Sequence, residues 1–154
     1  MNTYLLLKLL HIAAVIAFLG NITTGLFWHR HAARTRDPKL IGFTMDGIIR
    51  SDRIFTTPGV LLIIAGGVAL AILGDFPLLR TRWILWALVL FGISGLAFMF
   101  RVAPLQRQLR SYAQSGTFDY ASYHALAVRW ERWGLLALLT PVAALVLMVL
   151  KPIA

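Results

Sequence analysis

Apolar residues dominate four long stretches of the chain, and polar residues collect between them. The stretches run over about residues 4–28, 54–74, 83–100 and 133–150, and the last three contain no charged residue. A bilayer core of ~30 Å needs about 20 apolar residues in a helix. Long apolar runs without alternation are helical, because a segment in lipid must satisfy its backbone hydrogen bonds internally. The pattern therefore predicts an all-α integral membrane protein, with one domain over residues 1–154 and a bundle of four transmembrane helices.

Composition supports a membrane protein. Of the 154 residues, 59% are hydrophobic and only 14% are charged, whereas roughly a quarter of the residues in soluble domains are charged. The chain has no cysteine, which excludes disulfides, thiolate metal sites and cysteine nucleophiles. The first stretch ends in the basic run Trp28-His29-Arg30-His31 rather than at a small-residue cleavage site, so we expect it to be retained as a helix.

The distribution of lysine and arginine predicts the orientation. Eleven of the fifteen basic residues lie in the links 29–53 and 101–132, against four at the N-terminus, in the link 75–82 and at the C-terminus. By the positive-inside rule, both long links are cytoplasmic and both termini periplasmic, in the inner membrane of a bacterium. The net charge of +9 is explained by this topology and by attraction to anionic lipid. Nucleic acid is not an expected partner, because no reading motif appears.

Helix signals also occur outside the four stretches. Asp37-Pro38 marks a stop, after which residues 40–53 have the pattern of an amphipathic helix leading into the second span. Asp119 predicts the start of a helix that continues into the fourth span. We expect Pro58 in the first turns of the second span, where proline is tolerated. Pro141 lies in mid-span and frees the carbonyl of Ala137, which favours a kink.

The first stretch carries the main candidate for chemistry. Lys8 and His11 are three residues apart, so they share a helix face, which Ala14 and Phe18 continue. With the terminus outside, His11 lies in the outer leaflet, where an ionisable residue is costly and becomes a functional candidate. His11 either packs against a neighbouring polar group or ligates a haem iron.

Neighbouring residues are consistent with haem. Ala14 leaves room for a flat ring and Phe18 lies where it can pack beneath that ring. Lys8 lies one turn nearer the surface, where it can neutralise a propionate, and Arg80 and Arg82 lie on the same side of the membrane.

The other polar residues are interpreted more simply. His29 and His31 are expected to be interfacial, and His124 to be a surface residue of a polar helix. Asp52 beside Arg53 is expected to be local charge compensation. The sequence shows no phosphate-binding loop, Ser-His-Asp set or paired carboxylates.

Nearly the full length of the chain resembles an uncharacterised group of bacterial four-span predicted integral membrane proteins. More distantly, it is similar to HemJ-type protoporphyrinogen oxidases and to the CopD copper-resistance membrane domain. The likeness rests on four motifs: Leu7-Lys8-Leu9-Leu10-His11-Ile12, Asp52-Arg53-Ile54-Phe55-Thr56-Thr57-Pro58, Ser94-Gly95 and Val149-Leu150-Lys151-Pro152. In HemJ-type proteins the histidine of span one is a haem b ligand, which implies that role for His11.

The chain departs from the HemJ pattern in ways that argue against porphyrinogen oxidation. Those enzymes have a functional lysine early in span three, where this chain has Ile84-Leu85-Trp86-Ala87. We expect Trp86 to occupy that space and to line the same pocket as His11. The Asn-Glu-x-x-Pro-like pattern before the last span and the Pro-Arg pair late in span one are also missing.

The sequence thus predicts a haem b-binding membrane protein with a redox or electron-transfer role. The rival class is a non-enzymatic membrane module, either an assembly partner or a protein that handles copper or a small solute. Whether the protein is an enzyme stays open, as does a homo-oligomer; the lipid bilayer is the expected partner.

Overall fold

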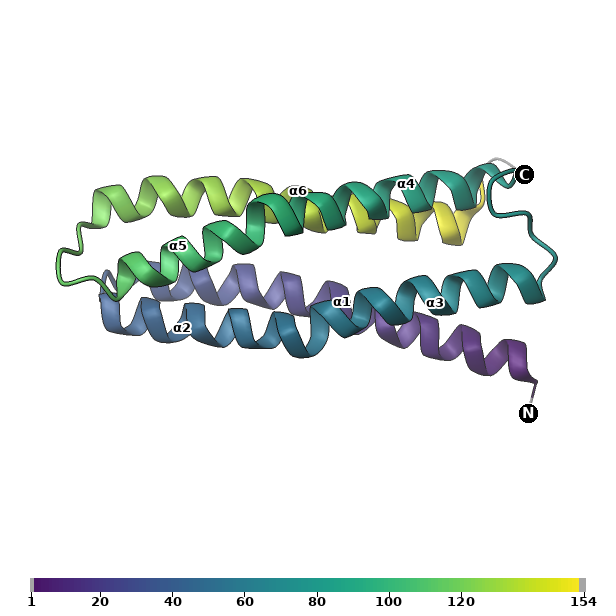
Figure 1. Ribbon diagram of the computed structural model, residues 1–154, viewed down its shortest axis with the longest axis horizontal. Helices are drawn as coiled ribbons and strands as arrows, with labels where there is room; N and C mark the ends of the chain where they lie inside the picture. Colours follow the sequence, from purple (N-terminus) through teal and green to yellow (C-terminus); the bar gives the residue numbers. More distant parts are fainter. Residues whose placement is uncertain (1, 153–154) are drawn as a thin grey trace.

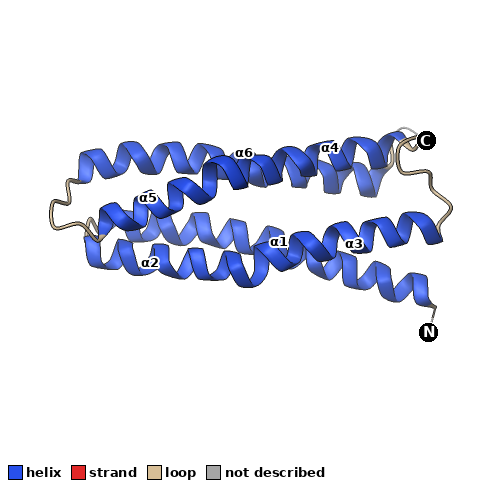
Figure 2. Cartoon of the chain, in the orientation of Figure 1, coloured by secondary structure: helices blue, strands red, loops and turns tan. Residues whose placement is uncertain are grey.

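Six α-helices, joined into four long rods, make up the computed structural model, which describes residues 2–152. The helices are α1 (Thr3–Arg34), α2 (Pro38–Ser51), α3 (Thr57–Leu73), α4 (Arg82–Ala97), α5 (Ala103–Ala113) and α6 (Tyr120–Leu150). Helices α2 and α3 form one rod and α4 and α5 another (Figure 1). The described part of the chain contains no strand (Figure 2). The prediction of four membrane-spanning helices is confirmed.

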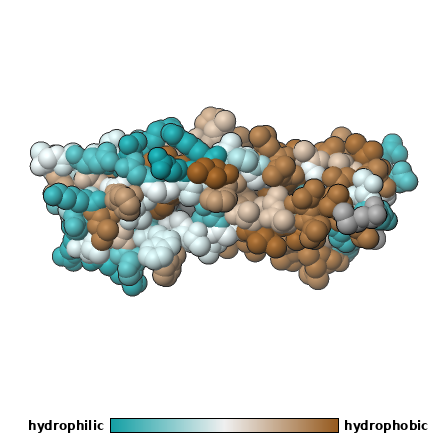
Figure 3. Space-filling view, turned by 90° about the horizontal axis from the view of Figure 1, so that it is seen from below, coloured by the Kyte–Doolittle hydropathy of each residue, from teal (hydrophilic) through white to brown (hydrophobic). Residues whose placement is uncertain are grey.

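Each rod is longer than the bilayer core. Helix α1 has 32 residues, which is ~48 Å at 1.5 Å per residue. The link 74–81 lies at the same end of the bundle as Thr3 and Leu150, and the links 35–37 and 114–119 lie at the opposite end (Figure 1). Apolar side chains cover the half nearer the termini, and hydrophilic ones gather in the other half (Figure 3). We call these the apolar half and the polar half.

The helices pack differently in the two halves. In the apolar half, α1 packs along α3 and α4 along α6, and the buried cluster between α1 and α3 is small. In the polar half, α1, α2, α5 and α6 enclose a continuous core in which Ile41, Met45, Leu109 and Tyr123 are fully buried. Many large apolar residues of the apolar half stay exposed, such as Leu9, which is the surface expected of spans that face lipid.

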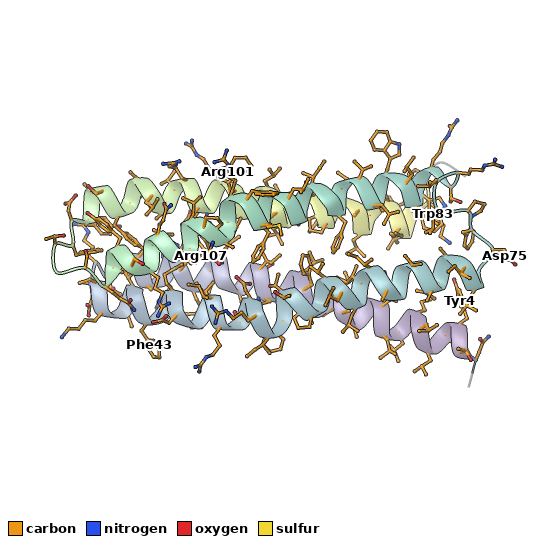
Figure 4. All side chains as sticks on the ribbon, in the orientation of Figure 1. Tyr4, Phe43, Asp75, Trp83, Arg101 and Arg107 are labelled. Carbon is orange, nitrogen blue, oxygen red and sulfur yellow. The ribbon has the colours of Figure 1, made fainter. Side chains whose placement is uncertain are left out.

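Side chains on the rods follow this division. Tyr4, Asp75 and Trp83 mark the end that carries the termini, while Phe43, Arg101 and Arg107 lie farther toward the polar half (Figure 4). The helix starts follow the sequence signals. Asp119 accepts from the backbone N–H of Ser122, so the predicted start at Asp119 is confirmed as an N-cap. Asp37, expected to mark a stop, also accepts from the backbone N–H of Lys39 and caps α2, which begins at Pro38 rather than at residue 40.

A π-helical turn joins the halves of each two-helix rod. The turns span Asp52–Thr56 and Phe98–Val102, and a proline, Pro58 or Pro104, follows each after one intervening residue. A proline ring clashes with the carbonyl four residues earlier, which here belongs to Ile54 or Phe100, inside the widened turn. The expectation that Pro58 lies in the first turns of the second span is confirmed, because Pro58 lies in the first turn of α3. The π-turn before it accommodates the proline ring in the middle of the α2–α3 rod.

Candidate functional site

One stripe of α1 carries three polar residues into the bundle. His11, Asn21 and His29 belong to the inner face that includes the buried Ala14 and Phe18. At 1.5 Å per residue, Asn21 lies ~15 Å along the helix from His11, and His29 a further ~12 Å. Each residue meets a different neighbour, so the structure has three polar positions at three depths.

The outermost position is His11, which lies against the paired glycines of α3. A Cβ atom built on Gly66 would lie 3.3 Å from Nδ1 of His11, and one on Gly67 would lie 3.3 Å from its Cε1. The ring therefore occupies a cradle that exists because both positions are glycine. Nδ1 is buried and has no hydrogen-bond partner among residues 2–152, while the residue as a whole is only half-buried.

Two of the predicted neighbours of His11 take part in helix packing. Ala14 and Phe18 are buried, and both contact the region of Gly59 on α3. The Phe18 ring also meets that of Phe91 on α4, with centroids 5.6 Å apart. The space that Ala14 was expected to leave for a flat ring is thus occupied by α3.

The other predicted neighbours lie at the surface. Lys8 and Arg82 are exposed, near the end that carries the termini. Trp86 is 54% exposed on α4, which packs mainly along α6. The structure therefore brings His11 together with the glycine pair and not with Trp86.

The second position is centred on Asp52, in the first π-turn. Its Oδ1 accepts from Asn21 Nδ2 at 2.9 Å and from Thr56 Oγ1 at 2.7 Å, and its Oδ2 accepts from Gln106 Nε2 at 2.7 Å. Asp52 is buried and Arg53 is exposed. The expected charge compensation between these neighbours is wrong, because successive residues of a helix point in directions about 100° apart. Asp52 instead joins α1 and α5 across the bundle.

The third position is His29, in the core of the polar half. Its Nε2 lies 2.8 Å from the hydroxyl of Tyr123, and its Nδ1 lies 3.3 Å from Oε1 of Glu131. Arg30 donates to the other oxygen of Glu131 at 2.9 Å. The Trp130 ring packs edge-on to the imidazole, with centroids 4.7 Å apart. His29 is 1% exposed, so it is a core residue of the helix bundle.

His124 is exposed, as expected, and His31 is exposed as well. Across residues 2–152 no group of three His, Asp or Glu side chains is placed to hold a metal ion.

Pro141 shows how the apolar half satisfies a freed backbone group. Proline removes the N–H that would bond to the carbonyl of Ala137. The hydroxyl of Ser94 on α4 donates to that carbonyl at 2.6 Å, and both residues are buried. Helix α6 runs unbroken through Pro141, so an interhelical hydrogen bond replaces the missing intrahelical one.

The fold defines the class of protein: an all-helical integral membrane protein with four helices long and apolar enough to span a membrane. The chain belongs to the family described as predicted integral membrane protein (DUF2269), whose model matches residues 5–152. No curated protein and no solved structure matches the chain.

Proposed function

We propose that this protein binds haem b through His11 and has a redox or electron-transfer role in the membrane. The observation that carries the proposal is the setting of His11. The imidazole is held between α1 and a glycine pair, with Nδ1 buried against α3. Nε2 forms no hydrogen bond within the described residues and is not fully buried. Nε2 is therefore the nitrogen that a metal could reach.

The residues present match haem in part. His11 supplies one neutral nitrogen ligand. Lys8, one turn nearer the surface, and Arg82 are exposed cations that would neutralise propionates. Ala14, Phe18 and Trp86 do not surround the accessible edge of the His11 imidazole. The lipid-facing side of α1 would therefore form a larger part of the haem site than the sequence analysis predicts. When bound, haem b supplies a one-electron redox couple.

A set of histidine variants tests this proposal. Purified wild-type protein should show a Soret band, which His11→Ala should abolish while the protein still inserts into the membrane. His31→Ala and His124→Ala are matched controls, because both side chains are exposed, and they should leave the spectrum unchanged. His29→Ala is a poor control, since it removes a buried side chain with two polar partners. A wild-type protein without haem absorbance would leave the non-enzymatic membrane module as the better interpretation.

The proposed location is the bacterial inner membrane, with both termini periplasmic. The excess of lysine and arginine in residues 29–53 and 101–132 supports this orientation. The structure places the two termini at the end of the bundle opposite these basic segments. Reporter fusions at the C-terminus should behave as periplasmic, and fusions within links 35–37 and 114–119 as cytoplasmic. A cytoplasmic C-terminus would reverse the topology and move His11 to the inner leaflet.

A further inference from the structure

The hydrogen bonds around Asp52 form a closed site between helices rather than a surface cluster. Its donors come from α1, from its own π-turn and from α5. Asp52 forms no ion pair with any residue in the range 2–152. A buried carboxylate without a cation is costly, and a bound proton removes the charge.

The partners of Asp52 suit either protonation state. Asn21 and Gln106 carry amides and Thr56 a hydroxyl, and each of these groups both donates and accepts hydrogen bonds. With Asp52 ionised, all three donate to it, as the structure shows. With Asp52 protonated, the new O–H needs an acceptor, and an amide supplies its oxygen by turning over. An arginine or lysine in these positions would accept nothing and would fix the carboxylate form.

A small cavity adjoins this carboxyl group. Its volume is about 20 Å³, which is room for one water molecule. Its polar lining consists of Asn21, Asp52, Gln106 and Trp130. Trp130 is 2% exposed, and its indole N–H is buried with no partner among the described residues. A water in the cavity would accept from this N–H and donate to the carboxylate, which meets the needs of both groups.

We propose that Asp52 and one water in this cavity form a site that binds and releases a single proton at the cytoplasmic side of the span. The proton comes from water and goes to a carboxylate oxygen, and no electron moves. The groups that face the site from α1, α5 and α6 are the neutral Asn21, Gln106 and Trp130. His29, which contacts Tyr123 and Glu131, packs edge-on against the Trp130 ring. This site does not depend on haem.

Infrared difference spectroscopy on the purified full-length protein tests the site. Across a pH titration, the wild type should show a carboxyl C=O band that shifts in D₂O. Asp52→Asn, which preserves the shape of the side chain, should lose this band. Asp46→Asn is the matched control, because Asp46 is a half-exposed carboxylate of the neighbouring helix that pairs with Arg110, and it should keep the band.

A second variant keeps Asp52 in place and so covers the case in which Asp52→Asn does not fold. Trp130→Phe removes the indole donor, and it should shift the Asp52 band and remove the O–D stretch of the internal water. Trp133→Phe, at a site one turn away and outside the cavity, should change neither. An Asp52 that stays ionised at every pH at which the protein remains folded would overturn the proposal. So would an Asp52 band that is the same in Trp130→Phe and wild type.

Discussion

The hydrogen bond between Ser94 and Ala137 offers a quantitative test of how the apolar half is held together. Ser94→Ala removes the hydroxyl that donates to a carbonyl which Pro141 has already deprived of its helical partner. Interhelical hydrogen bonds in membranes average ~0.6 kcal/mol and reach ~1.7 kcal/mol, while an unsatisfied buried group costs about 1–3 kcal/mol. We therefore expect Ser94→Ala to lower the free energy of unfolding by about 1–2 kcal/mol.

The same structure predicts how this cost depends on Pro141. In a Pro141→Ala background, the new backbone N–H can bond to the Ala137 carbonyl, so Ser94→Ala should cost markedly less. The coupling between the two substitutions should be about 1 kcal/mol, within the range for residues that share a partner. Reversible unfolding in mixed micelles measures all four proteins of the cycle.

The control for this cycle is Ser111→Ala, because Ser111 is exposed and its side chain forms no hydrogen bond with residues 2–152. Its effect should stay within about 0.5 kcal/mol. If Ser94→Ala has the same cost with proline or alanine at position 141, then the Ala137 carbonyl is not the group that Ser94 stabilises, and the explanation of how α6 tolerates Pro141 fails.

Two further predictions follow from local geometry. Gly66→Ala places a methyl group 3.3 Å from His11, whereas the new Cβ of Gly20→Ala meets nothing within 4 Å. The free energy of unfolding of Gly66→Ala should therefore be about 1–2 kcal/mol lower than that of Gly20→Ala. Equal stability of the two variants in a detergent unfolding assay would argue against the close contact between His11 and the glycine pair. Hydrogen bonds from the backbone and side chain of Ser122 lower the pKa of Asp119, so its cap stabilises the start of α6 above the unfolded pKa and is lost as the pH falls through the folded value. The protection of residues 120–124 against hydrogen exchange, measured relative to the intrinsic rate at each pH, should therefore fall in acid for wild type, whereas Asp119→Asn, which still caps, should show no such change.

The four spans and the helix starts could be predicted from the sequence because each depends on local signals. Apolar length defines a span whatever it packs against, and Asp37 and Asp119 cap helices through backbone groups two or three residues away. The amphipathic pattern of residues 40–53 likewise predicts a helix leading into the second span, and α2 occupies most of that range. The structure joins these pieces into continuous rods.

The polar core was harder to predict, because sequence neighbours are not spatial neighbours on a helix. Their adjacency in the sequence suggests that Arg53 compensates the charge of Asp52, yet the structure buries Asp52 and exposes Arg53. Steps of three or four residues connect His11, Ala14, Phe18 and Asn21 on one face of α1, and a further two steps of four, through Gly25, reach His29. The spacing along α1 therefore indicates which of its polar residues face the bundle. The partners Gln106 and Tyr123 lie on other helices, and only the tertiary structure identifies them.

The most direct test of the central claim is the haem content of the purified wild-type protein. Expressed with ample haem and extracted gently, it should yield a b-type pyridine haemochrome spectrum, with one haem for each chain that carries His11. A protein that is folded and inserted, yet colourless under these conditions, would contradict the claim that this family member binds haem b.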